Sequence, residues 1–357
     1  MSGPLRVGLI GCGNIARRAH LPAIDRLRDR VRLVATADVN EAAARAVAAT
    51  WEAATYGDGH KLIDRRDIDI VMIAAPEFAH RQWTEAAAAA GKHVLCEKPM
   101  APTLADADAM ITACRSAGVH LMIGHSRRFT RRYIEIRRAI DRGDVGSVRL
   151  LRENERRSSV TGGTGDRYWT SEHWTGNPAL SVGAALTNGI HEADLLRWFA
   201  ASEPVAVFAE QKITGERNRE VPDFISFSVR FADGAVGSSE ISNCLPPGYP
   251  AFHQCEIYGT RGAIRAKDHD LLSLTRYRDA GADFPESQEI LLHNSAAYVR
   301  EWAAFLDTLQ HGRPLPMPPD EARAALRLAL AAVESARTGA PVRLSPDGPA
   351  GRKGSPA

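Results

Sequence analysis

The chain has 357 residues, of which 44% are hydrophobic and 25% charged, with a formal net charge of +2. This length predicts two domains, each able to bury a core. The near-neutral charge excludes a global attraction to nucleic acid or to a membrane surface, so we expect small-molecule partners. We expect a cytoplasmic protein for three reasons. The five cysteines show no CxxC spacing, no signal sequence opens the chain, and no apolar run reaches about 20 residues.

The first third of the chain alternates between short apolar runs and helix-like segments. Strands are predicted at 5–11, 31–38, 69–76, 93–99 and 119–124, with helices at 14–28, 41–51, 78–92 and 103–118. Thr103 with Asp106 three residues on is an N-cap signature, and Gly118 is placed to end the same helix. The alternation predicts a doubly wound parallel sheet, the Rossmann arrangement, over residues 1–124.

A glycine motif follows the first strand. Gly11, Gly13 and Ala16 form G-x-G-x-x-A at the start of a helix, a pattern that allows a tight turn and close approach to a pyrophosphate. Asp38 ends the second strand, where a carboxylate can bind an adenosine ribose, and no arginine adjoins it to balance a 2′-phosphate. The motif therefore predicts NAD over NADP. The alternative is that the glycines serve only helix–strand packing.

Lys98 is one of only six lysines and stands where an apolar strand ends. Ligands of an open parallel sheet lie beyond the carboxyl ends of its strands, so this position faces the expected ligand. Pro99 favours an extended Lys98 and permits a cis peptide bond, and Pro76 marks the end of the neighbouring strand. We therefore expect Lys98 to act at the nicotinamide end of the site, whereas the other lysines fit solvated surface positions.

The rest of the chain changes pattern. Strand-like runs alternate polar and apolar residues between 148 and 267, and Asp233–Gly234 is a hairpin signal. We predict an α+β domain over residues 125–342 with a large, mostly antiparallel sheet, a helix at 320–337, and a disordered tail at 343–357. The arginine-rich segment 127–138 could suggest nucleic acid, but interleaved acidic residues favour a solvated helix face.

His191 opens an apolar, helix-like run in the second domain. Oxidation of an alcohol requires loss of its hydroxyl proton, and imidazole, with an ordinary pKa of about 6.5, suits that task. Taken alone, such a histidine is more often a structural hydrogen-bonding residue. A zinc motif is excluded because Leu195 stands where the second histidine would be, and no metal site is predicted.

The segment 156–176 is rich in glycine, small hydroxyl residues and aromatic residues. Tyr168, Trp169 and Trp174 could stack on the apolar face of a sugar ring, or could equally be ordinary packing residues.

The sequence resembles the glucose-fructose oxidoreductase / inositol dehydrogenase / MocA family of NAD(P)-dependent dehydrogenases. The resemblance covers nearly the whole chain and rests on "GLIGCGNIA", "PEFAH", "GKHVLCEKP", "GHSRRF", "NGIHEADLLRW" and the ending "ALRLALAAVESARTGAPVRL". It implies that Lys98 contacts the nicotinamide ribose and the reacting hydroxyl, and that His191 is the general acid/base. It also implies a homo-oligomer, a homodimer or homotetramer.

Motif and resemblance together give the candidate site residues. The cofactor set is Gly11, Gly13, Asn14, Ile15, Asp38, Ala75, Pro76, His80, Glu97 and Lys98. The substrate set is Arg128, Trp169, Asn188 and His191, and the catalytic set is Lys98, His191 and Thr187.

Thr187 is a departure from the family pattern. The family usually has an aspartate four residues before the histidine, and threonine cannot raise the basicity of an imidazole as a carboxylate does. A different substrate or a slower dehydrogenase follows. Asp194 could compensate, or could be a structural acid paired with an arginine such as Arg197.

Three functions are consistent with these residues. The first is NAD-dependent oxidation of a secondary hydroxyl on a sugar, inositol or sugar derivative. The second is an NAD-retaining glycoside hydrolase, and the third is a dinucleotide-sensing regulator without turnover. The presence of both Lys98 and His191 argues against the third.

Overall fold

The computed structural model describes residues 3–158, 173–214, 220–245, 251–267, 271–276, 286–291 and 296–345. The chain forms two compact units. Unit 1 comprises residues 1–136 and 292–326, and unit 2 comprises residues 137–291 and 327–357. The expected boundaries at residues 124 and 342 stay predictions. From residue 346 onward, the expected disordered tail lies outside the described residues.

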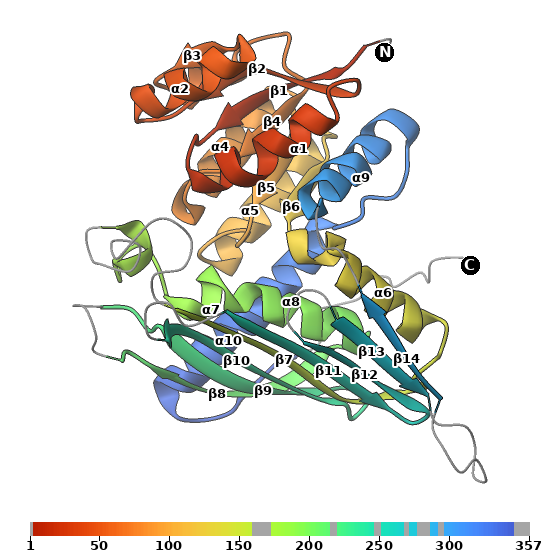
Figure 1. Ribbon diagram of the computed structural model, residues 1–357. Helices are drawn as coiled ribbons and strands as arrows, with labels where there is room; N and C mark the ends of the chain where they lie inside the picture. The colour runs from red at the N-terminus through yellow and green to blue at the C-terminus, as the bar shows by residue number, and fades with distance from the viewer. Residues whose placement is uncertain are drawn as a thin grey trace. The chain divides into compact units, whose positions relative to one another are not determined.

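Unit 1 contains a parallel sheet of six strands in the order β3-β2-β1-β4-β5-β6 (Figure 1). Its strands are β1 (Leu5–Ile10), β2 (Val31–Ala37), β3 (Ala54–Tyr56), β4 (Ile70–Ile73), β5 (His93–Glu97) and β6 (Leu121–Gly124). The side chains of β4 and β6 are buried throughout, as expected for strands covered on both faces. The predicted Rossmann sheet is confirmed. The three-residue β3 was missed because it is too short to show a periodic pattern.

Helices join and cover these strands. Unit 1 has α1 (Leu21–Arg26), α2 (Glu41–Trp51), α3 (Gly59–Ile63), η2 (Glu77–Ala79), α4 (His80–Ala89), α5 (Leu104–Ser116), η3 (Ser126–Phe129) and α9 (Ala297–His311). The predicted cap of α5 is confirmed, because the Thr103 hydroxyl accepts a hydrogen bond from the Asp106 backbone N–H at 3.1 Å. Late in the sequence, α9 returns to unit 1 and contacts α1 (Figure 1).

The helix after the glycine motif contains a π-helical segment, η1 (Ala16–His20), directly before α1. Pro22 explains this wider turn, because proline has no N–H to donate and its ring would clash with the carbonyl four residues earlier in an α-helix. Single π turns often occur at functional sites. In this segment, His20 becomes fully buried.

Unit 2 contains a nine-stranded sheet in the order β14-β13-β12-β11-β7-β10-β9-β8-β15. Its strands are β7 (Val148–Ser158), β8 (Pro204–Lys212), β9 (Phe224–Phe231), β10 (Val236–Leu245), β11 (Phe252–Gly259), β12 (Gly262–Lys267), β13 (Leu271–Arg276), β14 (Glu286–Leu291) and β15 (Val342–Arg343). Every pairing is antiparallel except that of β7 with β10. The sheet confirms the predicted α+β fold class, and the Asp233–Gly234 hairpin joins β9 to β10.

Two short elements precede the main helix of unit 2: η5 (Trp174–Gly176) and α7 (Ala184–Thr187), followed by α8 (Gly189–Ala200). Helix α8 packs on β7 and β10. Helices α6 (Arg131–Asp141) and α10 (Pro319–Thr338) each begin in unit 1 and end in unit 2. The predicted helix at 320–337 is therefore confirmed. No helix in the described part of the chain is long and apolar enough to cross a membrane.

Candidate functional site

The carboxyl ends of β1, β4 and β5 form one edge of the parallel sheet. Ile10 pairs with Ile73, and Ile73 pairs with Cys96, so the residues that follow these strands emerge side by side. The glycine turn, the Ala75–Pro76 loop and the Glu97–Lys98 segment are therefore neighbours. Ligands of open parallel sheets bind at this edge.

Gly11 is required by close packing at this edge. Its φ is +93°, and a Cβ built on it would lie 2.6 Å from the backbone C and O of Ala74. Gly13 differs, because a Cβ there would meet no atom within 4 Å. The space over Gly13 is therefore open, and its lack of a side chain keeps it open for a ligand. Asn14 and Ile15 begin the helix that follows.

Asp38 is fixed beside the glycine turn. One carboxylate oxygen accepts a hydrogen bond from the Cys12 backbone N–H at 2.7 Å, and the other accepts from the Asn40 N–H at 2.8 Å. Burial, and next the charge of Asp38, raise the pKa of the Cys12 thiol to about 12, so this cysteine stays a neutral packing group. An anchored carboxylate, an open glycine turn and a helix start together fit a dinucleotide.

His80 joins two loops of the edge. Its Nε2 lies 2.9 Å from the Ala75 carbonyl oxygen, and its Nδ1 lies 3.0 Å from the carbonyl oxygen of Pro99. The ring is 1% exposed, and burial lowers its pKa despite these carbonyl contacts. His80 was predicted to bind cofactor, and its ring lies between the loops that carry Ala75 and Pro99; the neutral ring has one N–H, which donates to one of the two carbonyl oxygens. Its contribution to the site is thus to hold these loops together.

Glu97 and Lys98 end β5, and the Lys98–Pro99 peptide bond is cis. The Glu97 carboxylate is buried and accepts hydrogen bonds from His20 Nε2 at 2.8 Å and from the Lys98 backbone N–H at 3.0 Å. Lys98 itself is half-buried. The carboxylate thus fixes the backbone from which the Lys98 side chain extends.

Glu77 is a second carboxyl group at this edge, and the sequence analysis did not single it out. It is 3% exposed and begins η2, the turn after β4. Burial raises its pKa to about 7, while a hydrogen bond with its own backbone and the positive charge of Lys98 oppose that rise. Its charge state therefore changes near neutral pH.

Glu77 should make stability fall with rising pH. The unfolded chain releases this proton near the ordinary value of 4.5 and the folded chain near 7. Between these values the unfolded state binds fewer protons, so the free energy of unfolding falls as pH rises, by up to about 3 kcal/mol.

Urea denaturation tests this sign. The free energy of unfolding of Glu77→Gln relative to the unaltered protein should rise from about pH 5 to about pH 8. Glu85→Gln, which changes a more exposed carboxylate on α4, is the control. A Glu77→Gln difference that is independent of pH would contradict the assignment.

In unit 2, the candidate residues lie on consecutive turns around a tight glycine. Gly183 has φ +77°, and a Cβ on it would lie 2.2 Å from the Pro222 carbonyl oxygen, so only glycine fits. The Thr187 hydroxyl donates a hydrogen bond to the Gly183 carbonyl at 2.9 Å. With its proton committed, Thr187 can accept but not donate a hydrogen bond to a ligand.

Asn188 and His191 follow Thr187. The Asn188 side-chain amide donates to the Asn243 side-chain oxygen on β10 at 3.0 Å. His191 lies in the first turn of α8 and is 9% exposed. The structure therefore brings Thr187, Asn188 and His191 together at one helix start. Lys98 belongs to the other unit, so its convergence with His191 stays a prediction.

Buried polar groups also occur on the sheet of unit 2. Glu155 on β7 lies opposite His253 on β11, with the His253 Nε2 3.5 Å from a Glu155 carboxylate oxygen. Both side chains are buried. This pair was not predicted, because residues at inward positions of an alternating strand are expected to be apolar.

The remaining predicted residues have separate outcomes. Arg128 is 8% exposed in η3 and lies 3.5 Å from Glu321 on α10, so it makes an ion pair within unit 1. Trp169 and Tyr168 lie outside the described residues.

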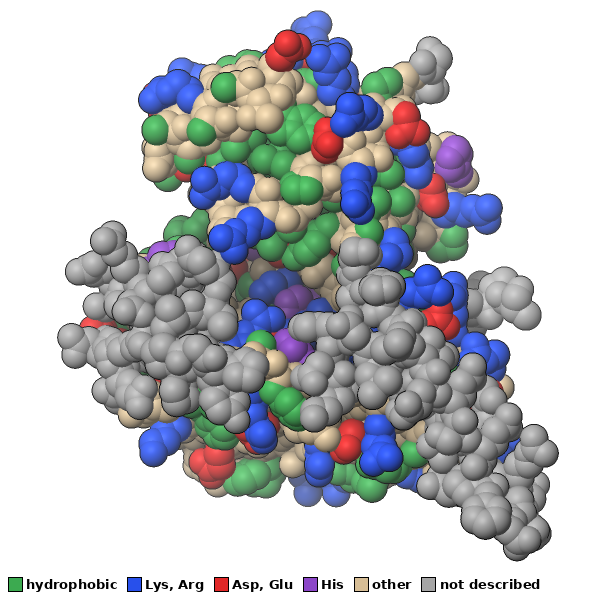
Figure 2. Space-filling view, viewed as in Figure 1, with side chains coloured by type: hydrophobic (Ala, Val, Ile, Leu, Met, Phe, Trp, Pro, Cys, Tyr) green, Lys and Arg blue, Asp and Glu red, His purple; other side chains and the backbone are tan. Residues whose placement is uncertain are grey.

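Where side chains are described, no group of three or more His, Cys, Asp or Glu residues is placed to hold a metal ion. Basic and acidic side chains are interspersed on the visible face of unit 1 (Figure 2).

Comparisons with known proteins cover both units. A family model described as "Oxidoreductase family, NAD-binding Rossmann fold" matches residues 5–125, and one described as "GFO/IDH/MocA C-terminal domain" matches residues 133–265. Inositol 2-dehydrogenase of Klebsiella pneumoniae is 30% identical over 279 residues, 76% of this chain and 77% of that relative.

Two solved structures are also similar. A levoglucosan dehydrogenase in complex with NADH and levoglucosan has a TM-score of 0.85 and 25% identity, and covers 96% of this chain and 99% of its own. The WlbA dehydrogenase from Bordetella pertussis, in complex with NADH and UDP-GlcNAcA, has a TM-score of 0.81 and 25% identity, with 96% and 100% covered.

Proposed function

Because the chain belongs to the GFO/IDH/MocA family of oxidoreductases, we propose that it oxidises a secondary hydroxyl of a sugar, inositol or sugar derivative with NAD. The observation that carries this proposal is the single sheet edge at which the glycine turn, the anchored Asp38 and Lys98 emerge together. The named ligands of the relatives, levoglucosan and UDP-GlcNAcA, support a hydroxyl-rich ring as substrate.

The cofactor would be held along this edge. We assign the pyrophosphate to the turn of Gly11, Gly13, Asn14 and Ile15, and the adenosine ribose to Asp38. The nicotinamide half would lie along Ala75, Pro76, Glu97 and Lys98, with His80 fixing two of these loops. When bound, the nicotinamide supplies the hydride acceptor.

The reaction needs two further groups. Loss of a hydride from the carbinol carbon leaves a carbonyl only if the hydroxyl proton also departs. We assign that proton to His191, and stabilisation of the developing alkoxide charge to the Lys98 ammonium. Thr187 and Asn188, with Trp169 and Arg128, are assigned to the binding of substrate hydroxyls. Thr187 would accept a hydrogen bond from one of them, since its own proton goes to Gly183.

A substrate panel tests the function. Sugars, inositols and sugar acids are incubated with NAD or NADP, and the near-ultraviolet absorbance of the reduced cofactor is followed. Accumulation of NADH with an oxidised sugar supports the dehydrogenase. Aglycone release without net NADH would point to an NAD-retaining glycoside hydrolase, and dinucleotide binding without turnover to a regulator.

Asp38 should set the preference for NAD. A carboxylate repels the 2′-phosphate of NADP and accepts hydrogen bonds from the ribose of NAD. Asp38→Ser should therefore reduce the NADH over NADPH preference about tenfold or more, measured as dissociation constants by cofactor fluorescence. Asp29→Ser, at an exposed position, is the control. Unchanged discrimination would show that another group reads the ribose.

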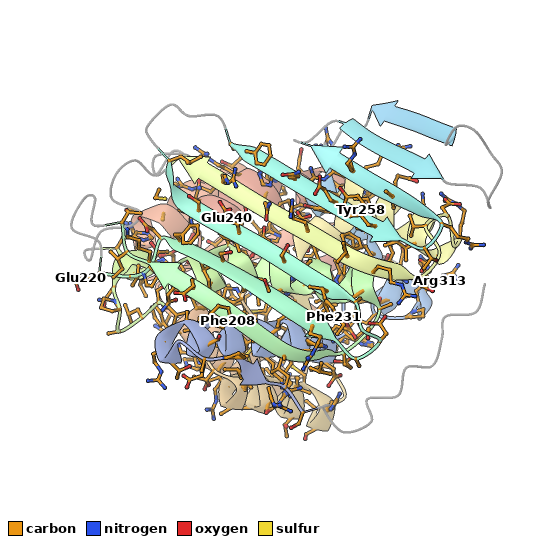
Figure 3. The ribbon with its side chains drawn as sticks, turned by 90° about the horizontal axis from the view of Figure 1, so that it is seen from below. Phe208, Glu220, Phe231, Glu240, Tyr258 and Arg313 are labelled. Atoms are coloured by element: carbon orange, nitrogen blue, oxygen red, sulfur yellow. The ribbon has the colours of Figure 1, made fainter. Side chains whose placement is uncertain are left out.

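We also propose that two copies of the chain pair through the sheet of unit 2. Figure 3 shows one face of this sheet, with Phe208, Glu240 and Tyr258 labelled. No described helix of unit 2 lies in front of this face. Leu150 on β7 is 53% exposed and pairs with Val236 on β10 and Tyr258 on β11, which are also exposed. A row of exposed apolar side chains across adjacent central strands is typical of a covered interface.

Light scattering after gel filtration tests the pairing. The unaltered chain should have at least twice the monomer mass, whereas Leu150→Arg, which places a charge in the middle of the apolar row, should be monomeric. Ser116→Arg, an exposed position on α5, should leave the mass unchanged. A monomeric unaltered chain would refute the proposal.

A further inference from the structure

A chain of hydrogen bonds runs from α9 to the base of Lys98. The Trp302 indole N–H donates to His20 Nδ1 at 3.1 Å, and His20 Nε2 lies 2.8 Å from a Glu97 carboxylate oxygen. The second Glu97 oxygen accepts from the Lys98 backbone N–H at 3.0 Å. All four residues belong to unit 1, although Trp302 is 282 positions from His20 in the sequence.

This chain of hydrogen bonds has a fixed direction. An indole nitrogen can only donate, so His20 Nδ1 must carry its lone pair and the ring proton must be on Nε2. His20 therefore donates to Glu97.

The residues that make these hydrogen bonds are buried away from water. His20 and Trp302 are each 0% exposed, and the ring of Tyr298 meets that of His20 edge-on at a centroid distance of 5.1 Å. In such a setting each missing hydrogen bond is costly, because water cannot replace it. The geometry of these rings is therefore tightly held.

The cluster contains a second carboxyl group, Glu301 on α9. It is fully buried, and neither oxygen meets a hydrogen-bond partner among the described residues. Burial, and next the charge of Glu97, raise the pKa of Glu301 well above its ordinary value. Burial would also raise the pKa of Glu97, but the hydrogen bond from His20 is the largest of the opposing effects, which together hold this pKa below its ordinary value. Glu97 is thus the ionised carboxyl of the pair.

Other titratable groups surround Glu97. From α9, the Tyr298 hydroxyl has its pKa raised by burial and, to a lesser extent, by the charges of Glu97 and Glu301. Cys96 on β5 is a buried thiol whose pKa is raised well above its ordinary value by burial and then by Glu97. His80 has its pKa lowered by burial. The nearby charge of Lys98 is among the effects that lower the pKa of Glu97.

We propose that His20 and Trp302 are positioning residues that hold the Glu97 carboxylate in place, so that Glu97 fixes the Lys98 backbone and orients its ammonium. This inference rests on the proposed role of Lys98 in turnover. Neither residue touches the expected substrate, and both act through Glu97. A misplacement of about 1 Å at a reacting group can cost about 100-fold in rate, so a loosened Lys98 segment should affect turnover more than cofactor binding.

Matched variants separate positioning from general packing. Trp302→Phe keeps an aromatic ring but removes the indole donor, His20→Gln keeps a donor for Glu97, and His20→Leu removes it. We expect kcat to fall about tenfold in Trp302→Phe and about 100-fold in His20→Leu, with partial recovery in His20→Gln and KM for NAD within about twofold. His60→Gln and Trp83→Phe alter a second His–Trp ring pair of unit 1 and should leave kcat unchanged.

A second measurement does not depend on activity. The lysines of the full chain are reductively methylated with ¹³C, and the NMR signals of the methyl groups are recorded. The signal of Lys98 is assigned by its absence from the spectrum of Lys98→Arg. Trp302→Phe and His20→Leu should shift this signal, and the His60 and Trp83 variants should not. An unmoved Lys98 signal, or a His20→Gln variant no better than His20→Leu, would overturn the proposal. If the unaltered protein oxidises no substrate, the proposed function fails, while the Lys98 signal still decides the positioning role.

Discussion

Replacing Lys98 with alanine is expected to lower kcat about 100- to 1000-fold while NAD binding stays within a few-fold. The ammonium is assigned to the alkoxide charge that develops during hydride loss, and removal of one preorganised donor costs about 3–4 kcal/mol of transition-state stabilisation. The dinucleotide keeps the glycine turn and Asp38, which are separate from this side chain. Steady-state kinetics with the best substrate of the panel and cofactor fluorescence give the two quantities.

The control for Lys98 is another lysine of the same unit. Lys61 is exposed on α3, so Lys61→Ala should leave both kcat and NAD affinity unchanged. Lys98→Arg keeps a cation but replaces a compact ammonium with a planar guanidinium, and it should restore only part of the activity. Full activity in Lys98→Ala would remove the lysine from the reaction and leave it a structural or cofactor-binding role.

His191→Asn is expected to lower kcat about 100- to 10,000-fold, the contribution typical of a positioned general base. The substitution should also abolish the pH dependence of kcat that reports loss of a proton from the imidazole. A side chain of purely structural importance would lower the amount of folded protein without removing this dependence. The pH profile of kcat, combined with thermal unfolding of the variant, therefore distinguishes the two roles.

An exposed histidine is the control for this second variant. His120→Asn, directly before β6, should leave the pH profile unchanged. If His191→Asn keeps the profile of the unaltered protein, the proton is taken by another group. Glu77, with a pKa of about 7, would then be the next residue to test in unit 1.

The sequence predicted the site residues whose chemistry is local. The strand endings at Asp38 and Lys98 could be located because each follows a short apolar run. The glycine turn could be located because its spacing is diagnostic of a strand–turn–helix unit. The cap at Thr103 was also found, since donor and acceptor are three residues apart. Local spacing carries this kind of information, so the parallel sheet and the strand ends at its carboxyl edge were both predictable.

Residues whose environment is made by distant segments were missed. His20 looked like one side chain of a predicted helix at 14–28, and only the return of α9 supplies Trp302 and encloses the ring. Glu77 looked like an ordinary polar residue after a strand, although the fold buries it. Thr187 could be recognised as a departure from the family, but not as a hydroxyl already bonded to Gly183.

Unit 1 is assembled from two segments, 1–136 and 292–326, and this has a consequence for synthesis on the ribosome. A nascent chain that has emerged to residue 136 already holds all six parallel strands, but it lacks Tyr298, Glu301 and Trp302. The side chains of Glu97 and His20 then face solvent at the place where α9 docks later. Unit 1 is therefore complete only when nearly the whole polypeptide has been translated, and we expect a fragment that ends at residue 136 to be less stable than the complete unit.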